Sequence, residues 1–280
     1  MFGSLLLVFR EALEAALIVG IVAAATRGVR SRGRWIGGGI ALGVLGAVLV
    51  AVFASRISDA LSGSGQEWFN ASVLFAAVAM IGWHVAWMSK HSRELAAQMK
   101  AVGRDVSSGS RPMTALMTVV AIAVLREGSE IVLLGYGLFA GGSSTNGLAL
   151  GGALGLLAGV LLGYAIYFGL LKVPVRYFFS ATNGLLVLLA AGMAASAAGF
   201  LTQADVLHAW TTPLWNSTWL LSDGSLAGRT MHVLTGYTAQ PSGIQLIFYG
   251  VTLVVLIVAM RVVSRLAAPS PAIARSSAAT

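Results

Sequence analysis

The chain has 280 residues, of which 57% are hydrophobic and only 10% are charged. Soluble domains carry about 25% charged residues, so this composition excludes an ordinary soluble globular protein. The net charge of +8 is typical, in a membrane protein, of basic cytoplasmic loops. Because the chain has no cysteine, disulfides, thiolate metal sites and cysteine nucleophiles are excluded as well.

Long apolar runs recur along the chain, and each reaches the roughly 20 residues that a helix needs to cross a bilayer core. They predict an all-α integral membrane protein with seven transmembrane helices. The expected spans are residues 3–26, 35–55, 68–88, 113–139, 147–171, 176–200 and 244–263. The first run lacks a basic start and a small-residue cleavage site, so we expect a retained helix rather than a signal peptide.

Two spans have capping-box signatures at their starts. Ser64 with Glu67 precedes the third span, and Ser242 with Gln245 opens the seventh. The stretch that follows the third span, residues 90–105, is basic and predicts a separate short helix on the cytoplasmic membrane surface.

The basic residues give the orientation. Fourteen of the 18 Lys and Arg residues fall in the loops after spans one, three and five or in the C-terminal tail, all on one side of the membrane. The opposite loops hold only Arg56 and Arg229. The positive-inside rule therefore predicts an outside N-terminus and a cytoplasmic C-terminus.

Two sets of residues repeat along the chain. The motif Arg-Glu-x-x-Glu occurs in spans one and four, and a stripe of small residues in span two recurs in span five. Small residues at every fourth position allow close helix packing in lipid. Because each unit has three spans, the second must be inverted, and inverted repeats place a substrate site at the midplane.

These observations predict one transmembrane domain over residues 1–265. We expect repeat one at 1–90, repeat two at 113–200, an external loop at 201–243, the seventh helix at 244–263 and a disordered cytoplasmic tail at 266–280.

The repeated motifs bury charge near the middle of the bilayer. Within each motif the three charged side chains share one helix face, because residues i, i+1 and i+4 lie within about 100° of one another. The spacing pairs each arginine with the second glutamate and leaves the first glutamate as surplus negative charge. The charged residues are Arg10, Glu11 and Glu14 in the first motif and Arg126, Glu127 and Glu130 in the second.

Intramembrane charges are costly and usually functional, so the four glutamates are candidate metal ligands and the two arginines their ion-pair partners. Carboxylates suit hard or borderline cations, which leaves iron, manganese, magnesium and calcium open. The structural alternative is that the motifs only lock two helices together by ion pairs, with the extra glutamates protonated.

Three histidines are further candidates for a role. His84 lies within the third span, where packing near the cytoplasmic interface is the favoured interpretation and a fifth ligand or a proton relay the alternative. His208 and His232 lie in the external loop, where a solvated loop is favoured over a cation funnel.

With paired Arg-Glu-x-x-Glu motifs in spans one and four, the chain resembles the oxidase-dependent high-affinity iron permeases, which include fungal permeases and the bacterial Efe-type ferrous iron permease. The resemblance covers essentially the whole chain, and the stretch at 214–245 also resembles the external loop of the bacterial branch. It implies an iron permease of the bacterial inner membrane that carries ferrous or ferric iron and holds no permanent cofactor.

The resemblance further implies roles and partners. The matching residues of the two motifs, Arg10, Glu11, Glu14, Arg126, Glu127 and Glu130, would form the translocation site. Bacterial relatives work with a periplasmic iron-binding protein and a haem peroxidase, and nucleic acid is not an expected partner. The chain lacks the external Asp-Ala-Ser-Glu motif of fungal members, so direct hand-over from a multicopper oxidase is not expected.

Other classes fit the sequence less well. A retinal protein needs a lysine in its last helix, and residues 244–263 contain none. An intramembrane metalloenzyme is disfavoured because no histidine follows the glutamates at ligand spacing. The nearest alternative is a related permease for manganese or lead.

Overall fold

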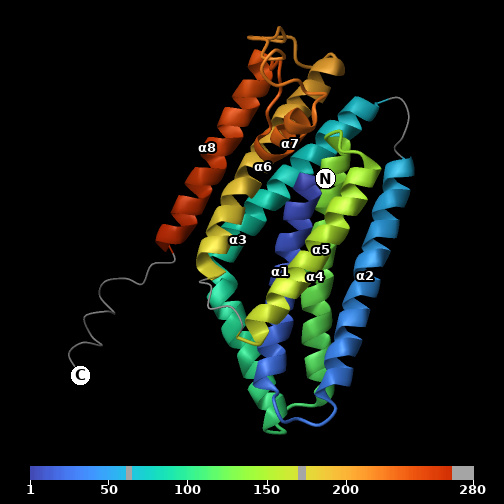
Figure 1. The fold of residues 1–280 in the computed structure, drawn as a ribbon, viewed down its shortest axis with the longest axis vertical. Helices are drawn as coiled ribbons and strands as arrows, with labels where there is room; N and C mark the ends of the chain where they lie inside the picture. The colour runs from blue at the N-terminus through green and yellow to red at the C-terminus, as the bar shows by residue number, and fades with distance from the viewer. Residues whose placement is uncertain (61–64, 170–174, 267–280) are drawn as a thin grey trace, which may run out of the picture.

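The computed structural model describes residues 1–60, 65–169 and 175–266, and every regular element in these ranges is a helix (Figure 1). The predicted tail at 266–280, apart from Leu266 at the end of α8, and Ser64 of the first capping box lie outside the described residues. The helices are α1 (Phe2–Ala25), α2 (Arg32–Ala60), α3 (Gln66–Ser107), α4 (Met113–Ala140), α5 (Thr145–Tyr167), α6 (Val175–Gln203), α7 (Leu226–Thr235) and α8 (Gly243–Leu266).

Five helices are long and apolar enough to cross a membrane by composition alone. They are the segments Arg32–Arg56, Gln66–Trp87, Thr145–Tyr167, Ser180–Gln203 and Gly243–Val263. Both α1 and α4 are also long and apolar, but every 18-residue window in them contains the three charges of a motif. The described chain is thus an all-helical, multi-pass membrane protein.

The long helices run up and down along the long axis of the molecule, so that α1 and α4 lie side by side and point in opposite directions (Figure 1). The segment between α6 and α8 gathers at the end where α1 begins, and α8 then runs back along α6. The α6–α8 and α3–α6 contacts form the larger hydrophobic cluster, which includes Leu74, Ile81, Leu186 and Leu256.

The glycine stripes predicted to allow close packing do so. Gly155 and Gly159 of α5 lie against the backbone of α1, where a Cβ on Gly159 would come within 2.7 Å of the Phe9 carbonyl oxygen. In the same way Gly39 and Gly43 of α2 lie against α4. The α5 stripe therefore packs on α1, which carries the first motif, and the α2 stripe packs on α4, which carries the second.

The third span differs from the prediction. Instead of a span followed by a separate surface helix, α3 is one continuous helix of 42 residues. Its second half packs against the end of α1, where the Ser107 hydroxyl donates a hydrogen bond to the Ala25 carbonyl oxygen at 3.0 Å and Gly103 lies against Ala25. This tertiary contact keeps the helix running beyond the apolar stretch.

The ends of the last helices also follow from local chemistry. At the start of α8 the Ser242 amide donates to Gln245 Oε1 at 3.0 Å, and the Gln245 amide donates to Ser242 Oγ at 3.4 Å, which confirms this capping box. The short helix α7 was not predicted. It begins with Ser225 as its N-cap, whose Oγ accepts from the Gly228 amide at 2.9 Å, and ends at Gly236 in the left-handed conformation.

The packing of α1 on α5 generates a testable prediction. Gly159→Ala should destabilise the protein by about 1–3 kcal/mol, because the new methyl meets α1 backbone that cannot move aside locally. Gly152→Ala is the matched control, since its Cβ would meet only a Val8 methyl at an ordinary 3.8 Å. Thermal unfolding of the purified variants in detergent measures the difference, and equal melting temperatures would contradict the close helix contact.

Candidate functional site

The charged residues of the first motif are buried within the helix bundle. Arg10 is 1% exposed, Glu11 is fully buried and Glu14 is 3% exposed. They lie on α1, which is flanked by α3, α4 and α5. Glycines on α5 let its backbone approach this part of α1 closely, where Gly159 meets Ala12 and Gly163 meets Ala16 of α1. The motif is thus enclosed by helices on several sides.

Arg10 pairs with both glutamates of its motif. Its Nη1 lies 2.8 Å from Glu11 Oε1, and its Nη2 lies 2.9 Å from Glu14 Oε1. The prediction that Arg10 pairs with Glu14 alone is therefore wrong. A guanidinium has donors enough to engage two carboxylates at once, so one arginine offsets part of the charge of each.

The second motif is arranged differently. Arg126 Nε lies 3.2 Å from Glu130 Oε1 and 3.8 Å from Glu127 Oε1. The Arg126 side chain is 31% exposed, and its guanidinium carbon lies 4.3 Å from the centre of the Trp87 ring, a cation–π contact. Glu127 itself is 2% exposed. The two motifs thus match in sequence but differ in how deeply their arginines are buried.

His84 on α3 joins the two motifs, contrary to the favoured interpretation of a packing residue near the interface. Its Nδ1 is in direct contact with Glu130 Oε2 of α4, and its Nε2 lies 3.8 Å from Glu14 Oε2 of α1. From the sequence, a fifth ligand was only the alternative for His84, because ligand spacing can be compared only along one helix. The available signal was an ionisable residue within a membrane span, which is by default a functional-site candidate.

The structure brings together all four glutamates that the sequence predicts. One ligand atom each from Glu11, Glu14 and His84 lie within 4.8 Å of one another, and the same holds for Glu11, Glu127 and Glu130. Glu11 belongs to both groups, and His84 contacts Glu130 across them. We call these five residues the central cluster.

The hydrogen-bonding state of the central cluster is unusual. Among the described residues, nine buried side-chain atoms have no hydrogen-bond partner, and eight of them belong to the cluster or to Arg10. Three of the glutamate oxygens among them, Glu11 Oε2, Glu14 Oε2 and Glu127 Oε2, also have no basic atom at hydrogen-bond distance. The other two contact basic side chains, since Glu130 Oε2 meets His84 Nδ1 and Glu14 Oε1 lies 2.9 Å from Arg10 Nη2. Since most buried polar atoms are hydrogen-bonded, acceptor oxygens gathered in this way fit a bound cation.

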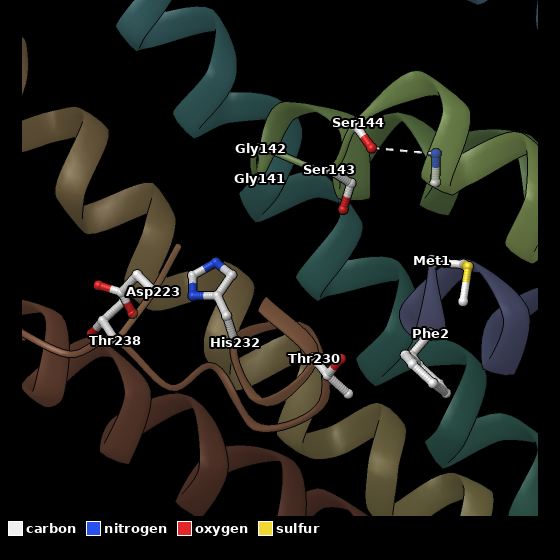
Figure 2. A pocket seen from close by; sticks show the side chains of 11 residues that line it. Met1, Phe2, Gly141, Gly142, Ser143, Ser144, Asp223, Thr230, His232 and Thr238 are labelled. Atoms are coloured by element: carbon white, nitrogen blue, oxygen red, sulfur yellow. Dashed lines mark hydrogen bonds between the residues drawn. The ribbon is translucent and has the colours of Figure 1, made fainter. Parts of the chain in front are cut away.

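The histidines of the segment between α6 and α8 lie elsewhere. His208 is exposed and lies 3.0 Å from Asp205, with which it forms a surface pair. His232 and Asp223 line a cavity of about 670 Å³ between the start of α1, the α4–α5 turn and this segment (Figure 2). We call it the upper cavity. The His232 Nδ1 is hydrogen-bonded to the Tyr237 carbonyl oxygen at 2.7 Å.

Comparison with known proteins decides the family. The model of the iron permease FTR1 family matches residues 1–274. The chain belongs to this family. It is 34% identical over 249 residues to the ferrous iron permease EfeU of Escherichia coli O6:H1, covering 86% of this chain and 88% of the relative. It is 30% identical over 258 residues to EfeU of Yersinia pestis, covering 91% of both chains. No solved structure matches the chain.

Family membership makes the protein a membrane transporter rather than an enzyme. The match extends over both motifs, α3 and the segment between α6 and α8. The central cluster is therefore part of a permease.

The unequal burial of the two arginines generates a prediction. Arg10→Ala strands two buried carboxylates, a loss that typically costs about 3–5 kcal/mol, so the yield of folded protein should fall sharply. Arg126→Ala is the matched comparison and should cost less, because Arg126 is partly exposed and Glu130 keeps its contact with His84. Folded yield and thermal unfolding in detergent measure both. Equal losses would contradict the asymmetry of the two motifs.

Proposed function

We propose that the protein is an iron permease that moves iron ions into the cell through the central cluster. The observation that carries this proposal is the convergence of four carboxylates, two from each of two antiparallel helices, three of which have an oxygen without a hydrogen-bond partner or a close basic atom. The relatives named above are ferrous iron permeases, which favours the ferrous ion as the substrate.

Charge balance supports a divalent cargo. Four ionised glutamates and two arginines sum to −2, so one ferrous ion leaves the cluster neutral. A neutral cluster avoids most of the cost of charge within the membrane, which is about 2.5–3.5 kcal/mol for each isolated charge on insertion scales. The arginines thus act as fixed partners, and the carboxylate oxygens replace the water ligands of the ion.

The proposed topology has seven spans, with the N-terminus outside and the C-terminus in the cytoplasm. It includes α1 and α4 as spans because their charges are paired within the bundle. It is supported by the alternating helix directions and by the basic α1–α2 and α3–α4 loops, which lie at the same end of the molecule (Figure 1). Labelling of terminal tags from either side checks it, and a cytoplasmic N-terminus would contradict it.

We assign repeat one to residues 1–90, repeat two to 113–200, the external segment to 201–243 and the seventh helix to 244–263, within one domain over 1–265. The support is reciprocal packing. The stripe of repeat two lies on α1, and the stripe of repeat one lies on α4, as an inverted pseudo-two-fold arrangement requires.

The upper cavity is the proposed entrance from the outside. It borders the start of α1, and Glu11 lies ten residues further along that helix, about 15 Å at the helical rise. We place the protein in the bacterial cytoplasmic membrane. A periplasmic iron-binding protein and a haem peroxidase are the proposed partners, with the external segment as the surface that faces them.

Uptake by purified protein in liposomes tests the function. The wild type should take up ferrous ions, and Glu11→Gln or Glu127→Gln should each reduce uptake to background, because each removes a charged ligand from one shared site. Glu94→Gln is the matched control, since Glu94 lies exposed on the second half of α3. Wild-type uptake by either cluster variant would overturn the site. Uptake of manganese or lead but not iron would favour the alternative permease.

A further inference from the structure

A third helix contributes to the central cluster. α3 packs against both α1 and α4, and His84 projects from it with a side chain only 4% exposed. The Arg-Glu-x-x-Glu motifs do not include this residue. A buried imidazole between carboxylates of two other helices is either a charge partner of those carboxylates or a ligand of a metal ion. The contacts of its two ring nitrogens decide between these roles.

The two nitrogens face different parts of the cluster. Nδ1 is in contact with Glu130 Oε2 on α4. Nε2 is directed toward α1, where it lies 3.8 Å from Glu14 Oε2. That distance is too long for a hydrogen bond, and Glu14 Oε2 has no hydrogen-bond partner of its own. A ligand atom of His84 also lies within 4.8 Å of a Glu11 oxygen.

This arrangement matches a common way of holding a metal ion. Histidines that bind metals usually donate the proton of one ring nitrogen to a carboxylate, which fixes the tautomer and leaves the other nitrogen free to coordinate. Here Glu130 stands at the first nitrogen and Glu14 offers an oxygen beside the second, while a Glu11 oxygen lies within 4.8 Å of the ring's ligand atom.

Resting on the function proposed above, we propose that His84 is a nitrogen ligand of the transported ion. Nε2 binds the ion together with Glu11 and Glu14, and Glu130 holds the ring by accepting a hydrogen bond from Nδ1. The occupant is a divalent first-row transition ion.

A nitrogen ligand gives the cluster a selectivity that carboxylates alone lack. Oxygen ligands suit magnesium and calcium as well as manganese and iron, whereas imidazole favours transition ions. Magnesium also gives up its water ligands reluctantly. His84 is therefore a specificity-determining residue of the site.

Pulsed electron paramagnetic resonance of the full-length protein, with any affinity tag removed and substoichiometric Mn²⁺ as the probe, tests the proposal. Wild-type protein should show nitrogen modulation from a bound imidazole, and ¹⁵N-histidine labelling should change its frequencies. His84→Gln should abolish the modulation, whereas His208→Gln, the matched control at an exposed histidine, should leave it unchanged.

If His84→Gln fails to fold, a variant in which His91, His208 and His232 are all replaced by glutamine assigns the signal, since the chain has four histidines. Retention of the modulation there supports His84, and its loss overturns the proposal. A third outcome is that wild-type protein binds Mn²⁺ without nitrogen modulation and that Glu127→Gln abolishes this binding. That result overturns His84 as a ligand but leaves the proposed function standing. If the wild-type protein binds no Mn²⁺, this inference is overturned. If it binds Mn²⁺ and Glu127→Gln leaves that binding unchanged, the inference is overturned and the shared site is contradicted as well.

Selectivity supplies a second readout that a purely structural histidine would not move. In liposomes, His84→Gln should lower ferrous uptake, and the uptake that remains should be about tenfold more sensitive to inhibition by excess magnesium or calcium. Unchanged sensitivity in a folded, active variant would contradict the role in specificity.

Discussion

The burial of four carboxylates inside an apolar helix bundle is the constraint on which the structure depends. On α1 alone, Glu11 and Glu14 have only Arg10 as a charge partner, and on α4 the partly exposed Arg126 serves Glu127 and Glu130. Because the four carboxylates converge, their uncompensated negative charge and their excess of acceptor oxygens lie at one place in the bundle. Under the proposed function a bound cation balances this negative charge, so an arrangement that would be costly in a purely structural protein suits a permease.

The rest of the fold keeps the motif helices in position. Glycines of α5 let it lie directly on α1, and glycines of α2 do the same for α4, so each motif helix is supported by the opposite repeat. The α3 helix inserts His84 between them and continues beyond the apolar stretch to pack against the end of α1. The two motif helices are thus held in place by the glycine contacts and by α3.

Much of this could be predicted from local patterns. The length of the apolar runs predicted the long helices, and the repeated motif predicted that the four glutamates come together. Small residues at every fourth position predicted the close contacts of α2 and α5. The rest depends on tertiary packing. The position of His84 between α1 and α4 is set by how α3 packs, the pairing of Arg10 with both glutamates depends on side-chain geometry, and α3 runs on because Ser107 and Gly103 meet α1.

The central claim is that both motifs form one site rather than two. The most direct test is equilibrium dialysis of ferrous ions against purified wild-type protein in the absence of oxygen. The measurement is repeated on variants that each lack one glutamate from one motif. One shared site predicts one ion per chain, and no high-affinity ion in either Glu14→Gln or Glu130→Gln. Two ions per chain, with one retained in each variant, would contradict the account.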